Sequence, residues 1–429
     1  GVPAARGSQA VTRTGAMAAP VRQPARVGAV APRDLRSTLR FGVVPRVRVS
    51  RPELWMVLGS ALLLAALGVY CINLSSGFSA TGLSGLALRQ TMYMTVGVVA
   101  MACVAIPHYR RFGPLAWPAL GASIALLVFL LVPFVPSSIV TPRNGARAWI
   151  DLGPLALQPA EFAKIAYILA LARYLRFRKN YRRFTGFIPP AVITFVPVTL
   201  IVLQPDLGSA LLFVPTLFAV LVAAGAKIRH IASVVVLGLA LAPLSYPFLL
   251  PHQKGRINAM VRQVQGDTSK ADTTQYQSLK AITLVGAGGA AGLGAEHSRA
   301  VIDFNDLPEQ HNDMIFAVIV NRFGFLGGLA TLALYITYIA GGFLAAARCK
   351  DPFGRLVAVG IVALIATQAV VNVGVCRGLV PVVGITLPFV SYGGSSMLAC
   401  FIGAGLLANV AMRPPERPYR HSFEFGEDE

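Results

Sequence analysis

The sequence predicts an all-α polytopic membrane protein with ten transmembrane helices and a long extracytoplasmic loop between the seventh and the eighth. Of its 429 residues, 55% are hydrophobic and 13% are charged, a composition unlike that of soluble globular or disordered chains. The apolar residues also gather in runs long enough to cross a bilayer, which takes roughly 17 to 25 helical residues. We place these runs at 54–74, 89–106, 114–135, 157–172, 186–203, 206–226, 231–250, 314–346, 356–376 and 391–412.

The basic residues orient these helices. Of the 38 lysines and arginines, 26 fall in the tails and loops of one side, 10 fall on the other side, and Lys164 and Arg322 lie inside runs. Because positively charged connections stay in the cytoplasm, we expect both termini there. The pI of 10.4 therefore reflects membrane orientation, and no nucleic-acid partner is predicted.

Two tails flank a membrane domain of residues 51–412. Residues 1–50 hold nine arginines and a single acid, Asp34. This composition, rich in Ala, Pro and Val, predicts a disordered cytoplasmic tail held near anionic lipid. Residues 413–429 form the second cytoplasmic tail.

The largest connection, 251–312, is expected on the extracytoplasmic side. Within it, residues 281–295 are apolar but contain five glycines, and they are too few for a confident span. We interpret them as a re-entrant or surface-lying segment. An added membrane helix here would place everything after it on the opposite side.

Polar motifs gather on the same side. Residues 144–153 (NGARAWIDLG) are typical of a structured loop, and residues 158–164 (QPAEFAK) open the fourth run. Glu161 and Lys164 are three apart, so they share a helical face and can pair. Such an intramembrane pair indicates either a functional site or a stabilising bridge to a neighbouring helix.

Two further motifs precede later runs. In residues 204–208 (QPDLG), Asp206 is a candidate site residue or an ordinary helix cap. Residues 384–396, with Ser391 and Ser395, offer backbone donors and hydroxyl groups that suit an anion.

The densest polar group of the chain, LPEQHNDMIF at 307–316, stands directly before a long apolar run. Asp313 is the last acid before that run, so we expect its carboxylate in the first helical turn, where the helix dipole favours the ionised form. Beside Glu309 and His311, it could accept a proton from a substrate hydroxyl. Asn312 and Asp313 are also typical of helix-capping residues, and local sequence leaves both interpretations open.

Together these motifs resemble the SEDS family, the RodA and FtsW proteins of cell shape, elongation, division and sporulation. The resemblance covers about 52–412 and rests on six motifs in order: NGARAWIDLG, QPAEFAK, QPDLG, HQKGRI at 252, LPEQHND at 307 and LPFVSYGGSS at 387. It implies a multi-pass protein of the bacterial cytoplasmic membrane that polymerises undecaprenyl-linked lipid II into peptidoglycan on the outer face. It also implies partners, a class B penicillin-binding protein transpeptidase and other elongation or division proteins.

The resemblance assigns roles to individual residues. Asp313 matches the family's catalytic aspartate and would act as the base in a single inverting displacement, by analogy with inverting glycosidases. Glu161, Lys164, Asp206, Glu309, His311, Ser391 and Ser395 match motif positions that would bind substrate or line its cavity.

The leaving pyrophosphate would need cationic stabilisation. Arg147, Lys254 and Arg256 are the candidates, and a divalent cation (Mg²⁺ or Mn²⁺) is a candidate cofactor. The sequence itself predicts no metal site, because its five cysteines lie in or beside apolar runs without paired ligand spacing.

The chain departs from the family pattern at several positions. Ala148 replaces an arginine before the motif tryptophan, and Asn321 and Arg322 replace two glutamates. Arg322 would either pair with an acid such as Glu161 or Asp206 or indicate altered or lost activity.

Two alternative functions therefore stay open beside the polymerase, a non-catalytic cell-wall scaffold and a flippase for lipid-linked precursors. The sequence does not distinguish an elongation protein from a division protein.

Overall fold

The computed structural model describes residue 1, residues 51–76, 82–136, 138–142, 146–151, 153, 156–177, 184–248 and 273–413, and a few positions between 254 and 265. Arg256 and nearly all of both predicted tails lie outside these residues. The elements are α1 (Pro52–Ser75), α2 (Gly85–Ala105), η2 (Tyr109–Arg111), α3 (Phe112–Leu131), β1 (Ile150–Asp151), β2 (Ala156–Leu157), α4 (Pro159–Leu175), η4 (Phe184–Phe187), α5 (Ile188–Leu203), α6 (Leu207–Leu211), α7 (Phe213–Ala224), α8 (Ile228–Ser245), η5 (Tyr246–Phe248), α10 (Thr273–Ala287), α11 (Gly294–Asn305), α12 (Ile315–Arg348), α13 (Pro352–Cys376) and α14 (Gly394–Met412).

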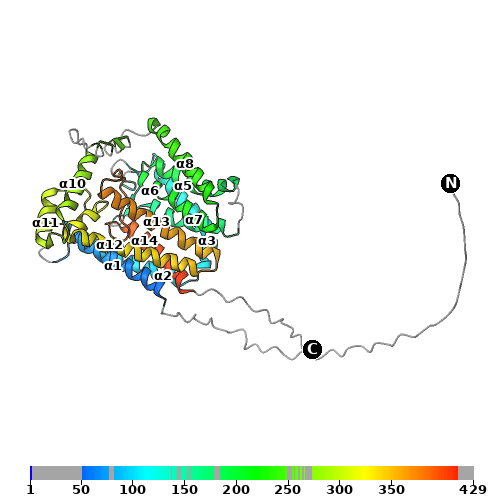
Figure 1. The fold of residues 1–429 in the computed structure, drawn as a ribbon, viewed down its shortest axis with the longest axis horizontal. Helices are drawn as coiled ribbons and strands as arrows, with labels where there is room; N and C mark the ends of the chain where they lie inside the picture. Colours follow the sequence, from blue (N-terminus) through cyan, green and yellow to red (C-terminus); the bar gives the residue numbers. More distant parts are fainter. Residues whose placement is uncertain are drawn as a thin grey trace, which may run out of the picture. The chain divides into compact units, whose positions relative to one another are not determined.

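The centre of the helical bundle is formed by α13 and α14. α13 packs against α4, α7, α12 and α14, and α14 also packs against α1 and α2. α1 and α12 run side by side along one flank (Figure 1). In the apolar stretches of α13 and α14, 67% and 72% of the residues are buried, against 22% in that of α2. α13 and α14 are therefore the core on which the outer helices pack.

Helices overlap all ten predicted runs, and eight segments are long and apolar enough to cross a membrane among the described residues. The two predicted runs without such a segment are those of α4 and α8. α4 has only 17 residues and carries charged side chains, and the apolar stretch of α8 is the short segment Ile228–Gly238. The all-α membrane fold is confirmed, apart from a two-residue pairing of β1 with β2, and the count of ten spans stays a prediction.

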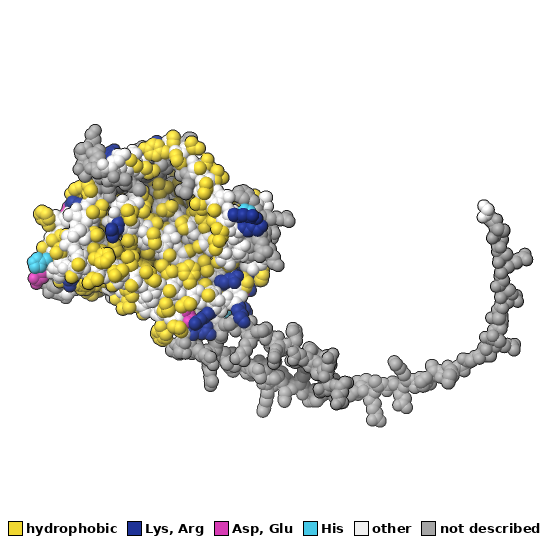
Figure 2. Space-filling view, viewed as in Figure 1, with side chains coloured by type: hydrophobic (Ala, Val, Ile, Leu, Met, Phe, Trp, Pro, Cys, Tyr) yellow, Lys and Arg dark blue, Asp and Glu magenta, His cyan; other side chains and the backbone are white. Residues whose placement is uncertain are grey.

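The outer surface of the bundle is apolar. Figure 2 shows hydrophobic side chains over much of the visible face, with lysines and arginines towards its margin. Leu63, Met92, Val99 and Ile336 are examples of exposed large side chains. Soluble monomers rarely expose contiguous apolar patches beyond a few hundred Å², so this surface is that of a membrane protein.

α12 is 34 residues long and breaks at Gly324, where the backbone is non-helical (φ 71°, ψ −168°). The turn between α10 and α11 fills this break. The N–H groups of Phe325 and Leu326 donate to the carbonyls of Gly289 and Ala290 at 2.8 and 3.2 Å. Backbone groups freed by the break therefore find partners within the protein, as the membrane requires.

The segment 281–295 consists of the end of α10, a turn and the start of α11. Its prediction as a re-entrant or surface-lying segment stays a prediction. Its glycines permit the turn to lie against the backbone of α12, which sequence periodicity does not reveal.

Asn321 joins α12 to both helices of this hairpin. Its Oδ1 accepts from the Ser298 hydroxyl at 2.7 Å, and its Nδ2 donates to the carbonyl of Leu284 at 3.1 Å. The departure from the family pattern at this position therefore serves packing.

Arg322 lies against α1. Its Nε donates to the hydroxyl of Tyr70 at 3.0 Å, and its guanidinium lies 5.0 Å from the ring centroid of Phe323. The predicted pairing with Glu161 or Asp206 is wrong, because the side chain reaches Tyr70 and both acids have other partners.

The Gly324→Ala variant should unfold at a lower temperature than the parent. A Cβ at this position would lie 2.3 Å from the carbonyl oxygen of Ala290, and the backbone conformation alone costs a non-glycine residue about 1–3 kcal/mol. Thermal unfolding in detergent measures the change. Gly121→Ala in α3 is the control, because its Cβ would meet nothing within 4 Å, and equal melting temperatures for the two variants would contradict the expectation.

Candidate functional site

A cavity of about 800 Å³ lies among α2, α4, α6, α13 and the start of α14. The loops before α4, α12 and α14 complete its wall. Seven of the residues predicted from the sequence line it: Glu161, Lys164, Asp206, Glu309, His311, Asp313 and Ser395.

The predicted cationic residues do not gather at this cavity. Arg147 reaches the carbonyl of Val135 at 3.5 Å, and Lys254 donates to the carbonyl of Pro247 at 2.8 Å. Neither lines the cavity, and Arg256 lies outside the described residues. The described residues that were expected to stabilise the leaving pyrophosphate are therefore not brought together.

Asp313 lies in the turn before α12. The helix begins at Ile315, so the expectation that Asp313 occupies the first helical turn is wrong by two residues. Met314 is the N-cap, and its side chain makes no capping hydrogen bond. Asn312 donates its amide to the carboxylate of Glu309. Asp313 lines the cavity and is 8% exposed.

The segment before α14 packs on this turn. The N–H of Tyr392 donates to the carbonyl of His311 at 2.8 Å, and the hydroxyl of Ser391 donates to the carbonyl of Asn312. The same hydroxyl accepts from the N–H of Leu387 at 2.7 Å. Ser391 itself does not line the cavity but supports the residues that do.

Glu161 and Lys164 form the predicted ion pair in α4. The Lys164 Nζ lies 2.7 Å from the Glu161 Oε1, and the two residues are 5% and 2% exposed. Pro159 occupies the first turn of α4, and both charged residues line the cavity. A pair so deeply buried is expensive unless its geometry is good, and here it belongs to the cavity wall.

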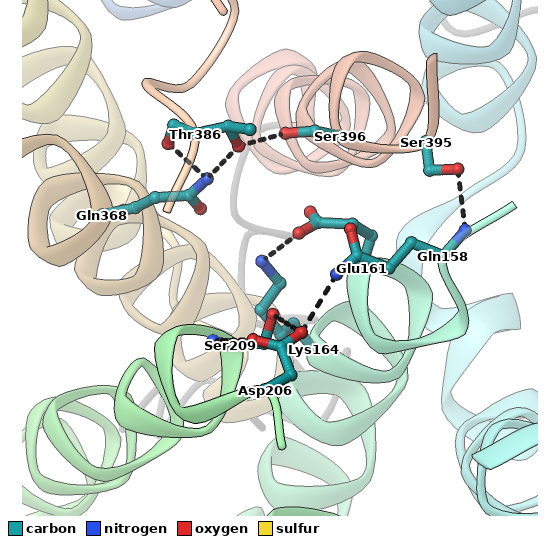
Figure 3. Close-up of polar contacts among 9 residues, drawn as sticks. All are labelled: Gln158, Glu161, Lys164, Asp206, Ser209, Gln368, Thr386, Ser395 and Ser396. Atoms are coloured by element: carbon teal, nitrogen blue, oxygen red, sulfur yellow. Dashed lines mark hydrogen bonds and ion pairs between the residues drawn. The ribbon is translucent and has the colours of Figure 1, made fainter. Parts of the chain in front are cut away.

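Asp206 caps α6 and also lines the cavity. Its carboxylate accepts from the N–H and the hydroxyl of Ser209 at 2.9 and 2.7 Å, and from the Gln158 amide at 3.1 Å. The capping interpretation is therefore confirmed, the role of Asp206 as a site residue stays a prediction, and Figure 3 shows how the cap is bonded to Gln158 at the start of α4.

Further hydrogen bonds lie along the wall in two separate sets (Figure 3). The Ser395 hydroxyl accepts from the N–H of Gln158 at 3.0 Å, and the neighbouring Ser396 shares a hydrogen bond of 2.9 Å with Thr386. Gln368 in α13 donates to the Thr386 carbonyl at 2.9 Å. We call this set, Gln158, Asp206, Ser209, Gln368, Thr386, Ser395 and Ser396, the polar belt.

His311 is half-buried at the cavity, edge-on to Tyr392 with ring centroids 5.8 Å apart. Burial lowers its pKa below the usual 6.5, and the nearby Glu309 carboxylate partly opposes this effect. The imidazole is therefore neutral at pH 7 and can both donate and accept a hydrogen bond.

Acids outnumber bases on the described wall. Five carboxyl groups line the cavity, those of Asp151, Glu161, Asp206, Glu309 and Asp313, against Lys164 and Arg89.

Sequence reasoning missed several cavity residues, among them Arg89 and Gln368. Arg89 stands at the edge of a predicted run, where a basic residue is ordinary, but the structure places it in the first turns of α2. Gln368 stands in an apolar run four residues before Asn372, and two amides at that spacing were the available signal.

The described residues include no group of three His, Cys, Asp or Glu side chains placed to hold a metal ion. The part of the cavity that the structure describes thus has no protein-only ligand set for Mg²⁺ or Mn²⁺. A requirement for a divalent cation stays a prediction.

Removing one partner of the buried ion pair should destabilise the protein more than removing both charges. Lys164→Met leaves Glu161 unpaired, which costs about 3–5 kcal/mol in comparable sites, whereas Glu161→Gln combined with Lys164→Met leaves no unpaired charge. Melting temperatures in detergent should rank parent, double variant and single variant in descending order. A double variant that is less stable than Lys164→Met would contradict the pairing.

Stability should fall on acidification because of His311. Its folded pKa lies below the unfolded value of about 6.5, so the unfolded chain binds the proton first as the pH drops through 6.5, and the free energy of unfolding decreases. The loss in melting temperature between pH 7.5 and 5.5 should be smaller in His311→Gln. Equal losses in the two proteins would show that His311 does not contribute.

The chain resembles known proteins along most of its length. The family model described as Cell cycle protein, FTSW_RODA_SPOVE, matches residues 54–415. Stage V sporulation protein E of Bacillus subtilis strain 168 is 35% identical over 327 residues, which are 76% of this chain and 86% of that protein. Peptidoglycan glycosyltransferase MrdB of Escherichia coli K12 is 32% identical over 329 residues, 74% of this chain and 85% of that protein.

A solved structure has the same fold. This structure, "Structural coordination of polymerization and crosslinking by a peptidoglycan synthase complex", superposes with a TM-score of 0.68 at 32% identity, covering 83% of this chain and 97% of the other. The polar belt, the buried ion pair and the aspartate before α12 thus belong to a protein of the FtsW/RodA/SpoVE family of cell cycle proteins.

Proposed function

We propose that this protein is a peptidoglycan glycosyltransferase that polymerises lipid II, with Asp313 as the catalytic base. One observation supports this role above the others. The Asp313 carboxylate is nearly buried, yet it lines a cavity of about 800 Å³, large enough to admit sugar rings. The relatives named as glycosyltransferases favour an enzyme over a scaffold or a flippase.

The reaction is one inverting displacement. The 4-hydroxyl of the acceptor N-acetylglucosamine attacks the anomeric carbon of the donor's terminal N-acetylmuramic acid, and the C–O bond to the undecaprenyl pyrophosphate breaks with its electron pair on the phosphate oxygen. The hydroxyl proton passes to the Asp313 carboxylate. The α-linked donor gives a β-1,4 product, so no carboxylate nucleophile is needed.

The two basic residues of the described cavity wall, Arg89 and Lys164, have different surroundings. The leaving pyrophosphate needs a positive partner. Arg89 lines the cavity, and the first turn of its helix, α2, contains no acidic residue. Lys164 is already paired with Glu161. We therefore place the pyrophosphate near Arg89 in preference to Arg147 or Lys254.

The membrane setting follows from the charges. With basic residues concentrated on one side, we infer that the chain lies in the bacterial cytoplasmic membrane with both termini in the cytoplasm. The cavity then faces outward, where the new glycan is needed. The solved structure of the same fold, a complex that coordinates polymerization and crosslinking, supports a transpeptidase partner of the class B penicillin-binding type.

Replacing the proposed base should abolish polymerisation. Asp313→Asn keeps the shape of the side chain but cannot take up the proton, and losing a general base lowers rates by about 10²–10⁴-fold. Labelled lipid II in detergent, with products separated on a gel, gives the rate for the full-length protein with a transpeptidase partner present.

Asp303→Asn is the matched control, because Asp303 is an exposed acid of α11 that does not line the cavity. It should polymerise at the parental rate. Parental activity in Asp313→Asn would rule out the base, and an inactive parent would favour the scaffold.

A further inference from the structure

The backbone on either side of Asp313 is held from outside its own turn. Three consecutive carbonyls accept hydrogen bonds: His311 from Tyr392, Asn312 from Ser391, and Asp313 from the Nδ2 of Asn372 at 2.8 Å. Each donor comes from a later part of the chain. The first two belong to the segment before α14, and the third belongs to the central helix α13.

Asn372 makes a second bond with the same amide group. Its Nδ2 also donates to the carbonyl of Ile385 at 2.7 Å, and Ile385 lines the cavity. Both hydrogens of one NH₂ group are thus used. They join the turn of Asp313 to another part of the cavity wall. One helical turn earlier, Gln368 holds the adjacent Thr386 in the same way.

We propose that Asn372 is a positioning residue that fixes the Asp313 carboxylate relative to the 383–386 wall of the cavity. The inference rests on the proposed role of Asp313 as base. Asn372 is 0% exposed and does not line the cavity, so it acts through the backbone and not on substrate. An aspartate at position 372 would place acceptor oxygens against the two carbonyls, and a leucine there would offer no hydrogen-bond donor.

The chain supplies a matched control in Asn409. It is also 0% exposed, and its Nδ2 also donates to two carbonyls, those of Val104 and Pro107 at 2.7 and 2.6 Å. It lies near the end of α14 and does not line the cavity. Replacing either asparagine removes two donations to carbonyls, and replacing Asn409 also removes the bond that its Oδ1 accepts from the N–H of Tyr109 at 3.0 Å, but only Asn372 is joined to Asp313.

Steady-state polymerisation of labelled lipid II separates the two asparagines. Asn372→Ala should lower kcat by about 10–100-fold, since misplacement of a catalytic group by about 1 Å costs of this order, with KM within about threefold of the parent. Asn409→Ala should keep kcat within about threefold, although its melting temperature falls at least as far. Asn372→Leu, which fills the volume without donors, should match Asn372→Ala and so separates lost hydrogen bonds from lost packing.

Ser391→Ala gives a second measurement, made alone and in combination with Asn372→Ala. Because Ser391 holds the adjacent carbonyl, its effect on kcat should be less than additive with that of Asn372→Ala. Additive effects, equal kcat losses in Asn372→Ala and Asn409→Ala, or a loss confined to KM would each overturn the positioning role.

Asp313→Asn measured in parallel keeps the two proposals apart. If Asp313→Asn is active, the base assignment fails whatever the asparagine variants do. If it is inactive while Asn372→Ala and Asn409→Ala behave alike, only the positioning role fails.

Discussion

The need to pair every polar group inside an apolar bundle governs this structure. Lipid offers no hydrogen bonds, and an unsatisfied polar group in it costs several kcal/mol. A polar cavity among membrane helices is therefore stable only if its wall groups satisfy one another. The polar belt does this by joining α4, α6, α13 and α14 through residues such as Gln158 and Thr386. The same bonds that make the cavity tolerable also make it rigid.

The same constraint applies to the backbone groups at the break in α12. A helix that stops at Gly324 exposes N–H and carbonyl groups, and the turn between α10 and α11 supplies their partners. The part of α12 before Gly324, which directly follows Asp313, is thereby fixed to the hairpin of α10 and α11. Asn321 strengthens this connection, so the chain has replaced a family glutamate without leaving a buried polar group unpaired.

Local pattern predicts much of this molecule. The helices follow from apolar run length, and the spacing of Glu161 and Lys164 alone predicts their pairing. Asp206, His311 and Asp313 stand out because they belong to motifs at the ends of runs. Contacts between distant segments leave no such local signal. Arg322 and Tyr70 are 252 residues apart, and nothing local to Arg322 indicates that partner. The spacing of Gln368 and Asn372 marks a shared helical face, but nothing local to them indicates their partners, Thr386, Asp313 and Ile385.

The surplus of carboxylates on the cavity wall bears on the end of the catalytic cycle. Among the described wall residues five acids face two bases. If a pyrophosphate is released near Arg89 as proposed, the surrounding carboxylates repel it and offset the attraction of the guanidinium. This balance of charge would favour release of the product over its retention in the cavity.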